Sequence, residues 1–316
     1  MVEIVRYTSE RKAEWDTFVR SSRNATFLFM RDYMDYHADR FTDCSLMFYR
    51  EEKLVALLPA NWVSDERMVS SHGGLTYGGL VMCDGLTSVR VMEVFAAMLD
   101  WMRTELGAKA LLYKPIPYIY DRCPSEEDLY ALFRHQAVLY TRSLSSVVDM
   151  AHRIPFRKGR KSTVKLAHSR GVTIAESADW VAFWSILSQV LHERHQAVPV
   201  HSVEEMELLH SRFPEEIKLY AAYASDGRMI AGTVIYEFPD MVHAQYIASS
   251  SEGKASGAVD LLYAWLINER YTDKRYLDFG TSVEQGGRVL NEGLVRQKEG
   301  FGARGVVYDS YMINID

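Results

Sequence analysis

The apolar and polar positions follow the same order of elements twice along the chain. Residues 46–63 (LMFYREEKLVALLPANWV) place two apolar, strand-like runs around a polar turn. Residues 219–238 do the same around SDGR, which contains the Asp-Gly signal of a β-hairpin. A further strand, a loop rich in Gly and Ser, a helix and a short strand follow each pair. The offset of about 170 residues predicts a duplicated domain.

Helical periodicity supports this order. Residues 88–107 and 258–273 each carry apolar positions at helical spacing, which predicts an amphipathic helix that packs on a sheet. The stripe of the second helix consists of Val259, Leu262, Tyr263, Leu266 and Ile267. We therefore predict an α/β fold of two domains, each with a twisted, mostly antiparallel sheet and helices on its faces.

The segments between the repeats complete the predicted organisation. Residues 123–135 read as a helix, 139–150 as a strand, 156–172 as a basic helix closed by Gly171, and 178–195 as a further helix. The boundary is expected near residue 145, which gives domains of residues 1–145 and 146–316.

Composition narrows the class of protein. The formal net charge of −6 argues against a general nucleic-acid binder. No apolar run approaches the ~20 residues that span a bilayer, and the charged N-terminal stretch predicts a cytoplasmic protein. The three cysteines are widely spaced, so neither disulfides nor a zinc knot are expected. His192 and His195 lie three apart, but no third ligand completes a metal site, and none is predicted.

One loop has the composition of an anion site. SSEGKASGA (residues 250–258) precedes the second amphipathic helix, which is expected to begin near Ser256. The unpaired amides of a helix N-terminus carry partial positive charge and bind phosphate. Gly253, Lys254, Ser256 and Gly257 are therefore candidate donor-binding residues. The alternative is an ordinary helix cap.

Three motifs give the chain a family resemblance. They are RKGRKSTVKLAHSRGV (157–172), YLDFG (276–280) and GLVRQKEGFG (293–302). With the repeated strand–loop–helix order, they resemble the Fem-like aminoacyl transferases, which are tandem-domain relatives of the GNAT acyltransferases. The resemblance implies two tandem GNAT-like domains, with the donor site in the second. It also implies that the strands 243–250 and 275–282 splay apart to admit an acyl group.

The resemblance further implies an N-acyltransferase. Such an enzyme passes an acetyl, other acyl or aminoacyl group from acyl-CoA or aminoacyl-tRNA to the primary amine of a small molecule or peptide. Attack is direct, because no Cys or Ser has the neighbours of an activated nucleophile. The basic helix from Arg153 to Lys165 is a candidate tRNA contact, and a solvated helix face is the alternative.

The expected catalytic residues follow from this chemistry. Lys298 is expected to hold the phosphate or the developing oxyanion of the donor, unless it is an ordinary surface lysine. Asp278 is expected to orient the amine or accept its proton, or else to cap the following turn. Glu284 has a similar role on the adjoining loop, and His195 is a second candidate base.

The remaining candidates line the donor and acceptor sites. Gln245 and Tyr246 lie on the strand before the anion loop and are candidates for the donor cleft, which only one of them can face because side chains alternate along a strand. Tyr246 is a candidate acid toward a departing thiolate. The other donor-binding candidates are Asn291, Gly300, Phe301 and Gly302. The acceptor-binding candidates, at matching positions of the first repeat, are His72, Tyr77, Lys114 and Tyr118. The alternative function is a non-catalytic, GNAT-like ligand-binding protein that has lost donor binding, because the loop lacks the Arg or Gln that opens the usual GNAT donor motif.

Overall fold

The computed structural model describes residues 2–315, apart from the side chains of residues 194 and 195. The chain forms two compact units. The first comprises the chain up to Ser143, Gln285–Arg288 and the segment from Val307 onward. The second comprises Leu144–Glu284 and Val289–Val306. Two long strands, β9 (Val138–Asp149) and β17 (Arg304–Asn314), contribute residues to both units.

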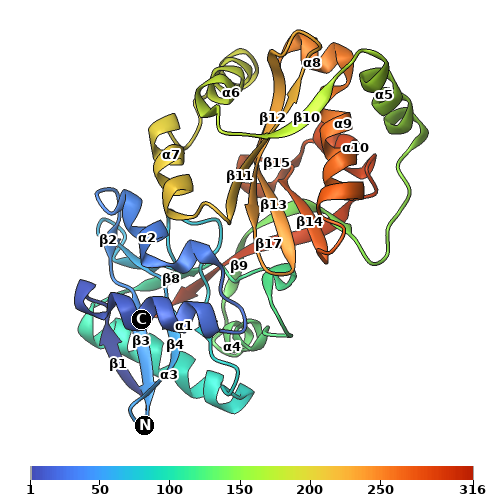
Figure 1. Ribbon diagram of the computed structural model, residues 1–316. Coiled ribbons are helices and arrows are strands. Elements are labelled where there is room, and N and C mark those ends of the chain that lie inside the picture. Colours follow the sequence, from blue (N-terminus) through green and yellow to red (C-terminus); the bar gives the residue numbers. More distant parts are fainter. Residues whose placement is uncertain (1, 316) are drawn as a thin grey trace. The chain divides into compact units, whose positions relative to one another are not determined.

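The first unit contains a four-stranded sheet, the strands β2, β5, β6 and β8 of an eleven-stranded sheet, and a long helix, α3 (Figure 1). Its elements are β1 (Glu3–Arg6), α1 (Lys12–Ser21), α2 (Arg31–Met34), β2 (Thr42–Asp43), β3 (Leu46–Arg50), β4 (Lys53–Leu58), β5 (Asn61–Val63), β6 (Met68–Ser70), β7 (Val81–Met82), α3 (Ser88–Glu105), β8 (Ala110–Tyr113) and α4 (Glu127–Arg134). One sheet has the order β1-β3-β4-β7. In the other, β8 lies between β6 and the end of β17, and β5 and β2 follow β6.

The second unit contains the strands β10 to β14 of the eleven-stranded sheet and the two-stranded sheet β15-β16. Its elements are α5 (Lys158–Ser169), β10 (Thr173–Ser177), α6 (Trp180–His195), α7 (Val203–Arg212), β11 (Ile217–Tyr223), β12 (Met229–Glu237), β13 (Met241–Ser249), α8 (Ser251–Ser256), α9 (Ala258–Trp265), a π-helical turn (Leu266–Arg270), β14 (Tyr276–Thr281), β15 (Val283–Glu284), β16 (Val289–Leu290) and α10 (Glu292–Glu299). The strands β10 to β14 follow one another in order, and β14 then pairs with β9.

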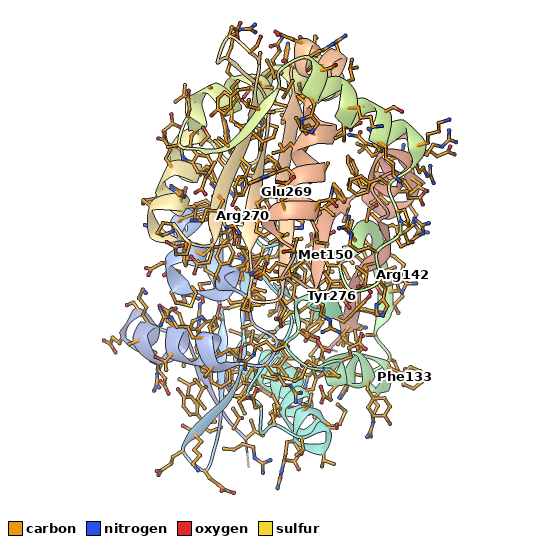
Figure 2. The ribbon with its side chains drawn as sticks, turned by 45° about the vertical axis from the view of Figure 1, so that its right-hand side comes forward. Phe133, Arg142, Met150, Glu269, Arg270 and Tyr276 are labelled. Atoms are coloured by element: carbon orange, nitrogen blue, oxygen red, sulfur yellow. The ribbon has the colours of Figure 1, made fainter. Side chains whose placement is uncertain are left out.

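Helices cover both faces of this part of the eleven-stranded sheet. The strands alternate their side chains between the faces. Val242 and Ala244 of β13 share a buried apolar cluster with Leu262 of α9, and Phe183 of α6 lies against Gly232 on the opposite face. In Figure 1, α9 and α10 accordingly lie to one side of β11–β13 and α6 and α7 to the other. Arg270, which Figure 2 labels, ends the π-helical turn. It pairs with Glu237 (N–O 3.2 Å).

The repeated order predicted from the sequence is present. In each unit a helix connects two parallel strands: α3 lies between β6 and β8 in the chain, and α9 between β13 and β14. The amphipathic helix predicted to begin near Ser256 is α9, which begins at Ala258. Two details differ from the prediction. The predicted loop before it contains a short helix, α8, and Gly257 separates α8 from α9. Helix α7 was not predicted, although Ser202 and Glu205 form the capping box that marks its start.

Candidate functional site

Two neighbouring strands of the second unit separate part-way along their length. β13 and β14 pair in parallel at only three positions, and the last pair is His243 with Asp278. Beyond it, β13 continues to Ser249, while β14 turns at Gly280, whose φ of 76° favours glycine. The expected splay of these strands is therefore present, and it leaves an opening in the sheet.

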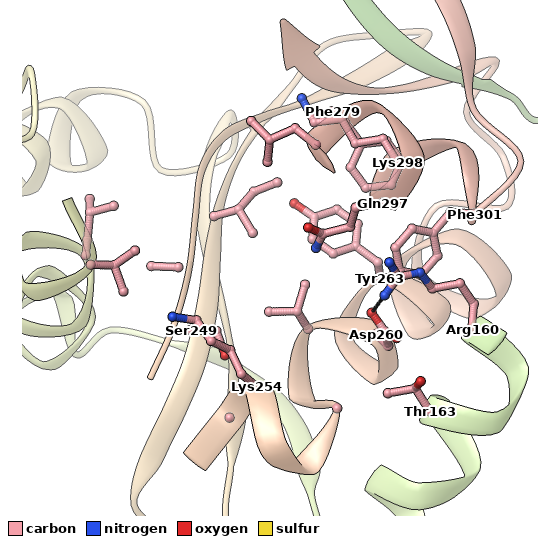
Figure 3. A pocket seen from close by; sticks show the side chains of 18 of the residues that line it. Arg160, Thr163, Ser249, Lys254, Asp260, Tyr263, Phe279, Gln297, Lys298 and Phe301 are labelled. Atoms are coloured by element: carbon pink, nitrogen blue, oxygen red, sulfur yellow. Dashed lines mark hydrogen bonds and ion pairs between the residues drawn. The ribbon is translucent and has the colours of Figure 1, made fainter. Parts of the chain in front are cut away.

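A pocket of about 500 Å³ lies along this opening (Figure 3). Its lining residues are Arg160, Thr163, Leu187, Val190, Leu191, Ile247, Ala248, Ser249, Gly253, Lys254, Gly257, Val259, Asp260, Tyr263, Phe279, Leu294, Gln297, Lys298 and Phe301. The walls are mainly apolar, with cationic side chains at separate points. The pocket thus brings together five of the predicted residues, Gly253, Lys254, Gly257, Lys298 and Phe301.

Lys298 is buried at the pocket wall, with 7% of its surface exposed. Its Nζ donates to the carbonyl oxygens of Gly280 (2.8 Å) and Thr281 (3.0 Å) and to the hydroxyl of Ser282 (2.7 Å). These bonds use all three ammonium donors. Burial lowers the pKa of Lys298 from 10.5 to about 8, and the negative charge of Asp278 opposes that shift. Lys298 therefore fixes the loop after β14 and brings a positive charge to the pocket.

Asp278 is completely buried beside the pocket. Its Oδ2 lies 2.8 Å from Nδ1 of His243, and its Oδ1 accepts from Ser145 of β9 and from the amide of Gly280. His243 was not among the predicted residues. Its contact with Asp278 depends on the parallel register of β13 and β14, which no local pattern reveals.

The predicted donor loop forms one wall of the pocket. Ser250 caps α8 through its hydroxyl, which accepts from the amide of Gly253 (3.1 Å). A Cβ at Gly253 would lie 2.3 Å from the carbonyl oxygen of Ile230, and one at Gly257 would lie 2.4 Å from Thr163. Ser256 donates to the Gly253 carbonyl within the helix. The two glycines therefore let α8 pack closely on β12 and α5, whatever the loop binds.

Arg160 of the basic helix also reaches the pocket. It forms an ion pair with Asp260, which is 4% exposed, and its guanidinium lies 5.2 Å from the ring centroid of Phe301. Arg157 pairs with Glu299 (3.0 Å), and Arg153 donates to Asn268 (2.7 Å). Three further lysines of α5 are exposed, and their side chains form no hydrogen bond or ion pair with the described residues: Lys158, Lys161 and Lys165.

Gln245 and Tyr246 do not line the pocket. The pairing of β12 with β13 shifts at Gln245, which forms a β-bulge. The hydroxyl of Tyr246 lies 2.6 Å from Nδ1 of His201, so Tyr246 holds the segment that leads into α7. Burial raises the pKa of Tyr246 to about 12. The side chain of His195 lies outside the described part of the structure.

The other candidates near α10 serve local structure. Asn291 caps α10 at the amide of Leu294 (3.1 Å) and donates to Glu284 (2.8 Å). A Cβ at Gly300 would lie 2.9 Å from Nε of Arg160. Gly302 has a φ of 91° and lies against the backbone of Ile154. The candidates Glu284, Asn291, Gly300 and Gly302 do not line the pocket.

The acceptor candidates all lie in the first unit. Lys114 donates to the carbonyl oxygens of His72 (2.6 Å) and Leu75 (2.5 Å), which joins Lys114 to the His72 loop. Burial lowers the pKa of Lys114 to about 8 and that of His72 to about 3. Tyr77 is buried and donates to Thr26 (3.3 Å), whereas Tyr118 is 48% exposed.

The family of the second unit follows from one comparison. Residues 152–285 match the family model described as an acetyltransferase (GNAT) domain. The chain carries a GNAT domain. The matched segment includes the separated strands, the donor loop and Asp278. Lys298 lies beyond it. The search of curated proteins gives no match.

Solved structures extend the fold to the whole chain. FemX is 12% identical with a TM-score of 0.67, and the match covers 97% of this chain and 96% of that one. L-PGS from Bacillus licheniformis is 12% identical with a TM-score of 0.63, covering 98% and 93%. A tandem GNAT protein from the clavulanic acid biosynthesis pathway is 10% identical with a TM-score of 0.53, covering 100% and 99%. At these identities the likeness establishes the fold.

The predicted fold of two tandem GNAT-like domains is thereby confirmed, as is the prediction of an acyltransferase. Within the described residues, no helix of the protein is long and apolar enough to cross a membrane. The same part of the chain contains no group of three or more His, Cys, Asp or Glu side chains placed to hold a metal ion.

Proposed function

We propose that the protein transfers an acyl or aminoacyl group from acyl-CoA or aminoacyl-tRNA to a primary amine, and that the transfer takes place in the pocket between β13 and β14. The observation that carries this proposal is the buried Lys298 ammonium at the wall of a largely apolar pocket in a GNAT domain. Apolar walls suit the carbon chain of an acyl group, and a fixed positive charge suits the oxyanion that direct attack creates.

The hydrogen bonds of Lys298 limit how it acts. Because Gly280, Thr281 and Ser282 use all three donors, the ammonium stabilises the transition state through its charge and through the loop that it fixes. A ligand oxygen that bonds Nζ directly replaces one of these acceptors. The Ser282 hydroxyl is the side-chain acceptor of the three.

The cations around the pocket suit a donor with phosphate groups. Lys254 and Arg160 line the pocket, and the exposed lysines of α5 belong to the same helix as Arg160. Acyl-CoA and aminoacyl-tRNA both carry phosphates; in acyl-CoA the pantetheine arm separates them from the thioester. The α5 lysines favour a long polyanion, because several unpaired cations along one helix make repeated phosphate contacts.

Ligand binding and turnover test the proposal. Thermal unfolding is followed with acetyl-CoA, longer acyl-CoAs and charged tRNA, since a ligand at 100 times its dissociation constant adds about 2.7 kcal/mol of stability. Leu191→Trp fills the pocket, and Leu208→Trp on α7, outside the pocket, is the matched control. We expect L191W alone to abolish the ligand-induced shift. No shift with any of these donors would contradict the proposal.

The alternative is binding without transfer. It is favoured by one observation, the saturated hydrogen bonding of Lys298. A thermal shift without product from any primary amine would support it. Three further points stay predictions. They are the domain boundaries, the cytoplasmic location, and the acceptor role of His72, Tyr77, Lys114 and Tyr118.

A further inference from the structure

A histidine and an aspartate meet where the two strands separate. His243 of β13 and Asp278 of β14 are the last pair of the parallel ladder, and Nδ1 lies 2.8 Å from Oδ2. Both side chains lie on the sheet face opposite α9, because their neighbours Val242 and Leu277 point into the cluster that contains α9. The pair therefore lies at the closed end of the opening.

Both oxygen atoms of the Asp278 carboxylate have hydrogen-bond partners. Its Oδ1 accepts from the hydroxyl of Ser145 and from the amide of Gly280 (3.0 Å), and its Oδ2 contacts His243. A carboxylate that accepts three hydrogen bonds is stabilised in its charged form. It only accepts, so Nδ1 of His243 carries the ring proton, and Nε2 carries the lone pair.

The remaining nitrogen of His243 is available. Its side chain is 12% exposed, and Nε2 makes no hydrogen bond with any described residue. A Cβ at Gly280 would lie 3.4 Å from Cε1 of the ring, and the carbonyl of Gly280 accepts from Lys298. The imidazole and the ammonium thus flank one residue of the loop that borders the pocket.

We infer that His243 is the general base of the transfer and that Asp278 is its positioning residue. The inference rests on the proposed function. The acceptor nitrogen forms a bond to the carbonyl carbon of the donor, and the bond from that carbon to the leaving oxygen or sulfur breaks. The proton lost by the acceptor nitrogen passes to Nε2 of His243 and from there to the leaving atom, while Asp278 stabilises the imidazolium.

The surroundings of His243 define what else affects its charge. Asp278 contacts it from β14, Tyr236 is its register partner on β12, and Lys298 approaches from α10 through Gly280. A purely structural role is the competing explanation: the pair would then only join β13 to β14, and its loss would change stability without changing pH dependence.

Nuclear magnetic resonance tests the pair without any substrate. Protein labelled with ¹⁵N-histidine is compared with His243→Asn, which identifies the signals of this ring. We expect the uncharged ring to carry its proton on Nδ1 and a lone pair on Nε2, and to show a mixture of tautomers in Asp278→Asn. A ring protonated at Nε2 in the unmodified protein overturns the inference.

Turnover provides the second test. Asn at position 243 keeps a donor at the place of Nδ1 and removes Nε2. The assay uses a primary amine and the donor that binds, acetyl-CoA or charged tRNA. We expect H243N to lower kcat by about 10²–10⁴-fold and to leave the KM for the donor unchanged. We also expect H243N to abolish the loss of rate at acid pH. His210→Asn is the control, because Nδ1 of His210 also holds an oxygen, the Ile217 carbonyl (2.8 Å), but on α7.

The proposed function and the role of His243 as general base can be contradicted independently. If H243N retains its turnover within a few-fold and its pH profile, the base assignment is wrong while the proposed function stands. If the unmodified protein transfers no group from either donor, the proposed function is wrong, and the tautomer measurement alone decides whether His243 has a basic Nε2.

Discussion

The Nζ of Lys298 lies 2.7 Å from the hydroxyl of Ser282, so the last turn of α10 is joined to the end of β14. The bond crosses from the helix that follows the matched GNAT segment back to the strand that borders the opening. Lys298 is thus both a structural link and a charge at the pocket. These two roles are separable by experiment.

Lys298→Met should lower turnover by about 10²–10³-fold, because removal of one group that stabilises an oxyanion has an effect of this size. It should also lower stability by about 1–3 kcal/mol, since the loop carbonyls lose their donor. Lys274→Met is the control: Nζ of Lys274 also donates to two carbonyls, those of Phe238 (2.8 Å) and Pro239 (3.0 Å), away from the pocket. K274M should lose stability and keep its activity. Equal activity in both variants would make Lys298 purely structural.

The lowered pKa of Lys298 predicts opposite effects of alkaline pH on rate and on stability. The folded pKa of about 8 lies below the ordinary 10.5, so the unfolded chain binds more protons between these values. The contribution of Lys298 to stability therefore rises as pH increases from 8 to 10.5, whereas its charge and the transfer rate decline above pH 8. Chemical denaturation and rate profiles check this. Lys114 has a similar pKa and contributes to the same pH range. Its contribution is removed by subtracting the free energy of unfolding of K298M from that of the unmodified protein at each pH. A difference that is flat across this range would contradict the prediction.

The exposed α5 lysines should affect a tRNA donor far more than acyl-CoA. Replacing Lys158, Lys161 and Lys165 together by Ala should weaken tRNA binding and reduce the dependence of its log affinity on log salt by up to about three contacts. The control replaces the exposed Lys53 and Lys109 of the first unit. Fluorescence anisotropy across a salt series measures both. An unchanged salt slope would indicate a solvated helix face.

Arg160 and Asp260 should show strong coupling. Arg160→Met leaves the buried Asp260 carboxylate without its ion-pair partner, and we expect a loss of about 2–4 kcal/mol, below the value for a fully buried pair because Arg160 is 25% exposed. Asp260→Asn in the R160M background should restore part of the loss. Denaturation of the two single variants and the double variant gives the coupling, and additive effects would show that the pair is not important for stability.

The local pattern was enough to predict most of the elements. The apolar stripe from Val259 to Ile267 predicted one helix, and the structure has α9 with a π-helical turn over that stretch. The strand predicted at residues 139–150 is β9, and the basic helix is α5. Periodicity and caps are properties of neighbouring residues, so they can be read from the chain alone.

The site was less predictable because its contacts join distant residues. Arg160 pairs with Asp260, and Lys298 binds the loop from Gly280, and neither partner is marked in the sequence. The His243–Asp278 contact needs the register of two parallel strands. Alternation along β13 predicts that one of Gln245 and Tyr246 faces the donor cleft; the bulge at Gln245 interrupts that alternation, and neither residue lines the pocket.

The bulge at Gln245 changes the face of the sheet to which the later residues of β13 point. Strict alternation would put His243 and Tyr246 on opposite faces of the sheet. With one extra residue, both point away from α9, and Ile247 instead of Tyr246 lines the pocket. A regular strand that kept Gln245 in the ladder would therefore exchange an isoleucine for a phenol in the pocket and detach His201 from Tyr246, although no side chain had been altered. At this position the path of the backbone is as strict a requirement as the identity of any residue.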